Sequence, residues 1–381
     1  MSELLGPAAP APRLNEAQKL AWLRLIRSEN VGPITFRTLV NRFGGAVNAL
    51  AALPELSARG GLRRAITIFS QDDAERELAR AQKAGLRLIA MGEPDYPKHL
   101  IASEGAPPLL YLAGTADILA GEFVAIVGSR NCSALGRKIT GLIARELGDA
   151  GFGIVSGLAR GIDAAAHEAS LATGTVAVMA GGADMIYPPE NKELYDQLYA
   201  RGAILSEMPP GLEPRGRDFP RRNRIVAGMA LGTVIIEAAA RSGSLITARL
   251  AAEQGRDVFA VPGSPLDPRA EGTNALIREG ATLVRSAADI IEALAPVRDR
   301  PPPQIEFPLA EDKTAASSLD DDSPAETDRG KIVNALSPSP VEIDDLIRHT
   351  KLPASAVLVI LLELELAGRL ARHPGNRVSL I

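Results

Sequence analysis

Cysteine, histidine and aromatic residues are scarce in this sequence of 381 residues. A single cysteine, Cys132, excludes an intramolecular disulfide framework and a cysteine-based zinc finger, and is typical of a protein of the reducing cytoplasm. The four histidines lie far apart and no HExxH motif occurs, so no metal site is predicted. Asp163 and His167, four residues apart on a predicted helix, are expected to form a hydrogen bond on its surface.

Long hydrophobic runs and a surplus of positive charge are also absent. The longest apolar run, residues 356–362, is too short to cross a membrane, and the N-terminus lacks a secretory signal. We therefore expect a cytoplasmic protein with no membrane partner. The formal net charge of −4 argues against a uniformly basic nucleic-acid-binding protein. However, residues 299–328 contain nine acidic and two basic residues, so the rest of the chain is close to neutral.

Composition divides the chain into five segments. Residues 1–13 are rich in proline and alanine and are expected to be disordered. Residues 14–80 show helical patterns, and residues 81–298 alternate strand and helix patterns. Residues 299–328 are rich in proline, serine and acidic residues, which predicts a linker without a packed core. Residues 329–381 show three helices and a terminal hairpin, which predicts a winged-helix domain.

The central segment contains continuously apolar strands separated by amphipathic helices. This pattern predicts an α/β fold with a doubly wound, mostly parallel sheet covered on both faces, which is a Rossmann-like domain. Seven strands are predicted, at 123–127, 152–155, 176–179, 203–205, 233–236, 258–261 and 282–284. An eighth strand is expected at 86–90.

Glycine- and serine-rich loops follow several of these strands. The first loop, Gly128-Ser129-Arg130, lacks the GxGxxG spacing of a dinucleotide site, and no P-loop occurs, so no cofactor is predicted. Similar loops lie at 156–161, 180–182 and 241–244. The carboxyl ends of parallel strands share one edge of the sheet, where helix N-termini attract anions. With Arg130 and Arg160, these loops predict a phosphate-binding edge.

The segment 213–224 concentrates positive charge, with five arginines and two acidic residues. Phe219 stands inside this cluster. Arginine neutralises phosphate and an aromatic ring stacks on an unpaired base, so the segment favours single-stranded DNA binding. Two alternatives remain: a solvated charged loop with Phe219 in the core, or pairing of Arg222 and Arg224 with carboxylates such as Glu207 or Glu237.

Several motifs in order resemble the bacterial DNA-processing protein A family, also called DprA or Smf. They lie within about residues 95–285 and include VAIVGSR, VSGLARGIDAAAH, MIYPPEN, FPRRNRIVAG and ARSGSLITARLAAEQGRDVFAVPG. The resemblance implies a recombination mediator of natural transformation that is not an enzyme. Such a protein would bind and shield incoming single-stranded DNA, help load the RecA recombinase, and form a homodimer through its Rossmann-like domain.

The site residues expected from the loops, the arginine cluster and the resemblance bind DNA, and none is catalytic or binds a metal. They are Gly128, Ser129, Arg130, Arg160, Lys192, Arg217, Phe219, Arg221, Arg222, Asn223, Arg224, Ser242, Gly243 and Ser244.

Two segments depart from DNA-binding patterns. The turn Asn30-Val31-Gly32 resembles a helix-hairpin-helix turn, but Asn30 replaces the first glycine, so we interpret the N-terminal domain as structural. The predicted recognition helix of the winged helix, residues 354–367, has no lysine or arginine and carries Glu363 and Glu365. A helix that reads a DNA groove needs hydrogen-bond donors, so this helix is expected to pack or to bind a partner.

Two other functions compete with DNA binding. Glu237 and the loop 241–244 occupy places comparable to the site of phosphoribohydrolases of the lysine-decarboxylase-like family, although their Pro-Gly-Gly sequence is absent. This alternative is a nucleotide-binding hydrolase. The other is a scaffold that works mainly through its winged helix. Release of a free base from a nucleotide would favour the hydrolase.

Overall fold

The computed structural model describes residues 13–298 and 324–381, which form two compact units. The first unit is built on residues 77–298, and the second combines residues 14–76 with residues 324–381. Residues 1–12 and 299–323, which contain most of the expected disordered N-terminus and acidic linker, lie outside the described residues.

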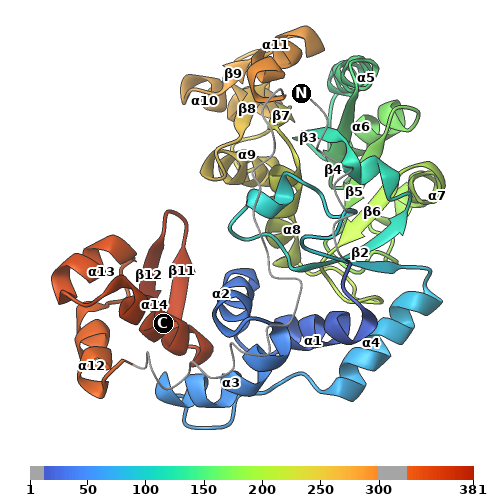
Figure 1. Ribbon diagram of the computed structural model, residues 1–381. Helices are drawn as coiled ribbons and strands as arrows, with labels where there is room; N and C mark the ends of the chain where they lie inside the picture. The colour runs from blue at the N-terminus through green and yellow to red at the C-terminus, as the bar shows by residue number, and fades with distance from the viewer. Residues whose placement is uncertain (1–12, 299–323) are drawn as a thin grey trace, which may run out of the picture. The chain divides into compact units, whose positions relative to one another are not determined.

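One nine-stranded sheet forms the centre of the first unit (Figure 1). The strands are β1 (Arg87–Ala90), β2 (Leu109–Gly114), β3 (Glu122–Gly128), β4 (Phe152–Ser156), β5 (Thr175–Val178), β6 (Ala203–Ser206), β7 (Gly232–Ile236), β8 (Asp257–Ala260) and β9 (Thr282–Leu283). Their order in the sheet is β1-β2-β6-β5-β4-β3-β7-β8-β9.

The seven strands from β3 to β9 run parallel, which confirms the predicted Rossmann-like sheet. The strand predicted at 86–90 is β1 and belongs to the same sheet. The strand β2 was not among the predicted strands, and it pairs antiparallel with both β1 and β6. Its sequence, LLYLAG, has no β-branched residue, whereas β-branched residues were the pattern that predicted most of the other strands.

Helices cover both faces of this sheet. Side chains of α5, α6 and α11 share one hydrophobic core with β3, β4, β7 and β8, whereas α8 and α9 pack on each other and on the opposite face. The helices are α4 (Gln71–Lys83), α5 (Ala134–Asp149), α6 (Ile162–Ser170), α7 (Lys192–Arg201), α8 (Asp218–Met229), α9 (Gly243–Glu253), α10 (Glu271–Arg278) and α11 (Ala287–Arg298). Short 3-10 helices lie at Leu100–Ala102, Asp117–Ala120, Pro189–Asn191 and Pro268–Ala270.

The path of the chain through the sheet creates a crevice at its centre. The parallel strands begin with β3, move outward through β4, β5 and β6, and then return to β7 on the other side of β3. The loops that follow β3 and β7 therefore run in opposite directions. Doubly wound sheets bind their ligands at this point, beyond the carboxyl ends of the strands.

The second unit contains an N-terminal helical domain and a winged helix (Figure 1). The helical domain comprises α1 (Glu16–Arg27), α2 (Pro33–Phe43) and α3 (Ala46–Arg59). The winged helix has the predicted three helices and terminal hairpin, joined by one further short strand. Its elements are α12 (Glu326–Ala335), β10 (Val341–Glu342), α13 (Ile343–Thr350), α14 (Ala354–Leu366), β11 (Leu370–His373) and β12 (Arg377–Leu380).

Two elements extend across expected domain boundaries. The helix α4 continues past residue 80, the expected end of the helical domain. The helix α12 begins at Glu326, inside the segment expected to be a linker, because its first turn carries the acidic residues Glu326 and Asp328, which favour a helix N-terminus.

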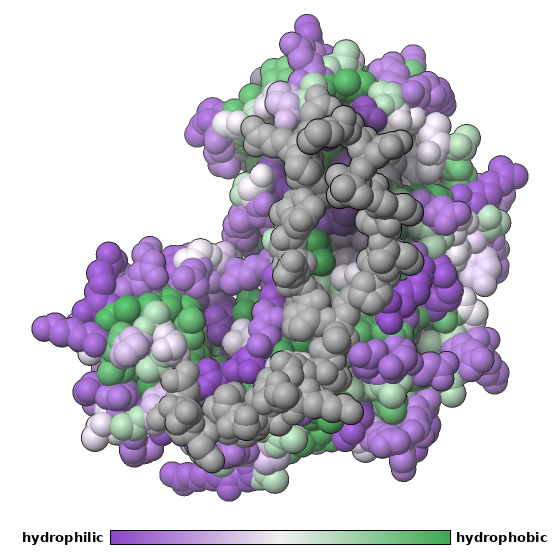
Figure 2. All heavy atoms as spheres, in the orientation of Figure 1, coloured by the Kyte–Doolittle hydropathy of each residue, from purple (hydrophilic) through white to green (hydrophobic). Residues whose placement is uncertain are grey.

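Across the described residues, no helix is both long enough and apolar enough to span a membrane. On the face drawn in Figure 2, hydrophilic side chains project along the outline of the molecule, with hydrophobic side chains between them.

Candidate functional site

A cavity of about 600 Å³ opens at the central crevice of the sheet. The loops that follow β3, β4 and β7 line it together with the first turns of α8 and α9. Three arginines line the cavity, Arg130, Arg222 and Arg241, but only one carboxylate, Asp163. The cavity is therefore positive, and the four segments that form it come from the glycine-rich loops and the arginine cluster predicted from sequence.

The loop after β3 brings a free cation to the cavity. A Cβ at Gly128 would lie 1.8 Å from the carbonyl oxygen of Ile236, so only glycine lets β3 and β7 approach this closely. The Ser129 hydroxyl accepts a hydrogen bond from the Asn131 amide at 3.1 Å. The Arg130 side chain is exposed, and in the described part of the chain it forms no ion pair. It is thus available to an anion.

Two aromatic side chains, Phe219 and Tyr187, form a surface beside Arg130, which we call the aromatic ledge. The Arg130 guanidinium lies 5.3 Å from the centre of the Phe219 ring, which packs on Tyr187 at 5.5 Å between ring centres. Phe219 is half-buried, and Tyr187 is 42% exposed. The alternative that buries Phe219 in the core is therefore wrong. Tyr187 belongs to the MIYPPEN motif but was not among the expected DNA-binding residues, because only the fold places its loop next to Phe219.

The first turn of α9 lines the cavity, and two of its amides bond to the capping residue Ser242: Ser244 N–H donates to its hydroxyl at 3.4 Å and Leu245 N–H to its carbonyl at 3.1 Å. Ser242 caps the helix, and its hydroxyl lies 2.7 Å from that of Ser244. A Cβ at Gly243 would meet nothing within 4 Å, so this turn is open to a ligand. The exposed Arg241 directly precedes it and lines the same cavity. Amide groups and positive charge at a helix N-terminus favour phosphate.

Arg222 is buried and holds the loop after β4. Its guanidinium donates to the carbonyl oxygen of Gly157 at 2.6 Å and to that of Val178. Burial lowers the pKa of Arg222 to about 10, so it stays charged at neutral pH. The opposing charge is Asp163, which accepts from the amides of Gly157 and Ala159 at 3.1 and 3.3 Å. Its own pKa is raised by burial.

Arg221 and Arg224 share one carboxylate. Arg221 Nε lies 3.0 Å from Glu207 Oε1, and Arg224 pairs with the other oxygen of Glu207 and donates to the carbonyl of Gly105. The predicted alternative of pairing with Glu207 is thus confirmed for Arg224, whereas Arg222 binds backbone carbonyls near Asp163. These two arginines have less charge to offer a ligand than the sequence indicates.

The remaining predicted site residues differ in whether they line a cavity and whether they form ion pairs. Asn223 lines it and donates weakly to the Gly243 carbonyl at 3.4 Å. Arg160 lines a second cavity of about 520 Å³ that also contains Arg130, and it pairs with Glu190 at 3.4 Å. Lys192 pairs with Asp196 and lines neither cavity. Arg217 is exposed at the N-terminus of α8, outside both linings.

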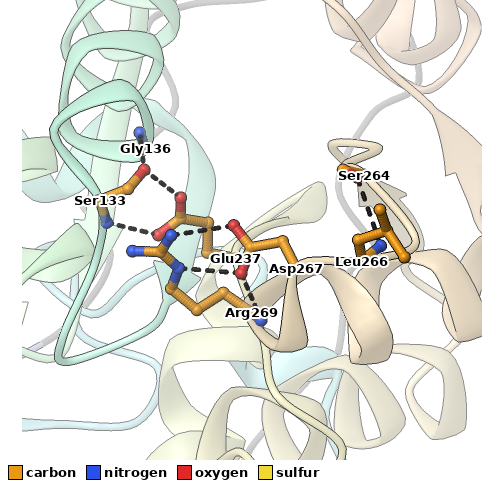
Figure 3. A network of polar contacts seen from close by, with 7 residues as sticks. All are labelled: Ser133, Gly136, Glu237, Ser264, Leu266, Asp267 and Arg269. Atoms are coloured by element: carbon orange, nitrogen blue, oxygen red, sulfur yellow. Dashed lines mark hydrogen bonds and ion pairs between the residues drawn. The ribbon is translucent and has the colours of Figure 1, made fainter.

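Glu237, the carboxylate considered for a hydrolase, does not line the cavity, and its side chain points toward Ser133 (Figure 3). It accepts hydrogen bonds from the Ser133 amide at 2.8 Å and from the Ser133 hydroxyl. Ser133 also caps α5 by accepting from the Gly136 amide at 2.9 Å. Beside this network Arg269 forms a double hydrogen bond with Asp267. Glu237 therefore fixes the start of α5.

The expected contact between Asp163 and His167 is absent. The Asp163 carboxylate faces the loop after β4, whereas His167 Nδ1 lies 2.7 Å from the Thr175 hydroxyl, because the helix buries both side chains against different strands. Among the described residues, no group of three or more potential ligand side chains is placed to hold a metal ion.

His167 makes stability depend on pH. Burial lowers its pKa to about 3, whereas the unfolded chain has a value near 6.5, so between these values the unfolded state binds the extra proton. The free energy of unfolding should therefore fall by about 2 kcal/mol between pH 6.5 and 5. Urea denaturation of His167→Gln should show a smaller loss, and the exposed His349→Gln should behave like wild type. Equal losses in all three proteins would contradict this role.

Family profiles match nearly the whole chain. DNA recombination-mediator protein A matches residues 87–295, the DprA-like N-terminal HHH domain matches residues 16–80, and the DprA winged helix domain matches residues 313–376. Among curated relatives, Protein Smf of Synechocystis is 33% identical over 95% of this chain and 98% of its own length. DNA processing protein DprA of Streptococcus pneumoniae is 48% identical over 51% of this chain and 70% of its own.

Two solved structures share the fold. DNA processing protein A (DprA) from Streptococcus pneumoniae is 36% identical, has a TM-score of 0.61, and matches over 73% of this chain and 98% of its own. DNA processing protein A from Helicobacter pylori, solved for its single-stranded DNA binding mode, is 30% identical with a TM-score of 0.51, over 56% of this chain and 96% of its own. The chain therefore belongs to the DNA recombination-mediator protein A family, the DprA/Smf family.

Proposed function

We propose that this protein binds single-stranded DNA in the cavity at the centre of the Rossmann-like sheet, shields it during DNA uptake, and helps load RecA on it. The observation that carries the proposal is that Arg130, which forms no ion pair among the described residues, lies beside the aromatic ledge of Phe219 and Tyr187. Phosphates would bind Arg130, Arg241 and the first turn of α9, and a base would stack on the ledge. Duplex bases are paired and stacked, so they cannot use this ledge.

The ledge gives a first prediction. Tyr187→Leu keeps an apolar side chain but loses the ring, and stacking on an aromatic side chain is worth about 1–3 kcal/mol per base. The affinity for oligo-dT, measured by fluorescence anisotropy, should fall about tenfold. Tyr199→Leu is the matched control, because Tyr199 is 45% exposed on α7 but, unlike Tyr187, does not line the small hollow beside Arg130 and Phe219. An unchanged affinity in Tyr187→Leu would remove this ring from the proposed site.

RecA is the proposed protein partner. We expect the chain to shorten the lag before RecA begins DNA-dependent ATP hydrolysis on single strands coated with single-strand-binding protein. The Arg130→Ala variant, which lacks the proposed phosphate contact, should fail to shorten it. A lag that wild type leaves unchanged would contradict the loading function while leaving DNA binding itself in place.

We further propose that the protein acts in the cytoplasm, as a homodimer through its Rossmann-like domain, and without enzymatic activity. Glu237 supports the last point, since it binds Ser133 and does not line the cavity. Incubation with nucleoside monophosphates should release no free base, and release would favour the hydrolase.

The proposed homodimer has its own test. The molar mass from light scattering should be that of two chains, with and without oligo-dT.

A further inference from the structure

The helix α14 of the winged helix carries buried residues on two of its faces, while Leu358 between them is 45% exposed. Val359, Leu362 and Leu366 are 5%, 1% and 0% exposed, yet they do not belong to the winged-helix core. The face that does belong to it consists of Val357, Ile360, Leu361 and Leu364. A second apolar face that is buried must be covered by side chains of another element. The second face of α14 therefore has a partner outside the winged helix.

That partner is the N-terminal helical domain. The helix α14 packs against α3 (Figure 1). Gly60 ends α3, and a Cβ there would lie 1.9 Å from the carbonyl oxygen of Glu363. Arg369 donates to the Gly60 carbonyl at 3.0 Å, and the Asn30 side chain donates to the Leu366 carbonyl at 2.9 Å. Backbone contact of this kind requires a defined, close interface.

The same contacts occupy the hairpin turn of the N-terminal domain. Asn30 lies in this turn, and its side chain is committed to α14. The backbone amides beside it also have partners, because Glu29 N–H donates to the Thr67 carbonyl at 3.0 Å and Val31 N–H donates to that of Ser28 at 3.3 Å. A turn that binds phosphate needs such amides free.

The two glutamates of α14 are paired within the winged helix, which also argues against contact with DNA. Glu363 is buried and forms a double hydrogen bond with Arg329, and Glu365 binds Arg372 at 2.9 Å. All four side chains belong to the winged helix, and α14 contains no lysine or arginine. A groove-reading helix would instead present unpaired donors.

We propose that α14 docks on α3 of the same chain, and that neither this helix nor the turn at Asn30 reads DNA. The partner of the winged helix is thus the N-terminal domain. This inference does not depend on how the Rossmann-like domain binds its ligand.

Hydrogen–deuterium exchange of the full chain tests the interface. Gly60→Ala places a methyl group against the Glu363 carbonyl, so peptides from α14 and α3 should exchange about tenfold faster, while the nine-stranded sheet keeps its protection. Gly32→Ala is the matched control, since a Cβ there would meet nothing within 4 Å. Arg369→Met removes one hydrogen bond without a clash and should accelerate the same peptides less.

The outcomes separate the possibilities. Unchanged exchange of α14 in both Gly60→Ala and Arg369→Met would overturn the docking. Exchange of wild-type α14 that slows with increasing protein concentration would assign the partner to a second copy and overturn the docking within one chain. Protection of α14 or of the turn at Asn30 by added duplex DNA would overturn the statement that they do not read DNA.

Discussion

Replacing Arg130 with alanine is expected to weaken binding of oligo-dT by about 2–3 kcal/mol, which is roughly thirtyfold to a hundredfold. The guanidinium is exposed, forms no ion pair among the described residues, and borders both cavities. It combines a phosphate contact with stacking on Phe219. The log–log salt dependence of binding should also become shallower by about 0.7, the value for one phosphate contact on a single strand.

Two variants make the Arg130 result specific. Arg130→Lys keeps the charge but not the planar group, so it should retain the salt dependence and lose part of the affinity. Arg249→Ala removes another exposed cation, which pairs with Glu253 on α9 and lines neither cavity, so it should bind like wild type. Equal weakening by Arg130→Ala and Arg249→Ala would mean that only the overall charge matters.

Replacing Arg222 with methionine is expected to lower the free energy of unfolding of the nine-stranded unit by about 3–5 kcal/mol. The change leaves the carboxylate of Asp163 buried without its opposing charge and removes the donor to the Gly157 carbonyl. Urea denaturation followed by circular dichroism is the suitable measurement, because the single tryptophan, Trp22, lies in the other unit.

The control for Arg222→Met is Arg217→Met, one turn earlier and exposed, which should change stability by less than about 0.5 kcal/mol. The double variant Arg222→Met, Asp163→Asn should recover part of the loss, because it removes the unpaired charge while keeping an acceptor for the loop amides. A loss below about 1 kcal/mol in Arg222→Met would show that the pair does not stabilise the fold.

Sequence alone could predict the sheet and the edge at which the cavity opens. Seven apolar strands with short helical connections leave few other topologies, and the glycine-rich loops then meet at one edge. The individual roles of the arginines could not be predicted, because they depend on partners far apart in the sequence. Arg224 meets Gly105 and Glu207, whereas the Arg130 guanidinium lies over the Phe219 ring.

The same distinction holds for the winged helix. The absence of lysine and arginine from residues 354–367 predicted a helix that packs or binds a partner, and α14 does pack on α3. The element that covers α14 was not predictable, because Gly60 and Glu363 are about three hundred residues apart. An apolar face shows that a helix is covered but does not specify by which element. The net charge of −4 gives no sign of the positive cavity, because it sums the acidic residues of 299–328 with the arginines that line the cavity.

The most direct test of the proposed function is a titration of fluorescent oligo-dT and of a duplex of equal length across a salt series. We expect the full chain to bind the single strand more tightly at every salt concentration, with an affinity that falls as salt rises and a shallower slope in Arg130→Ala. Equal affinity for single strand and duplex, or a slope that Arg130→Ala leaves unchanged, would contradict binding in the cavity at the centre of the sheet.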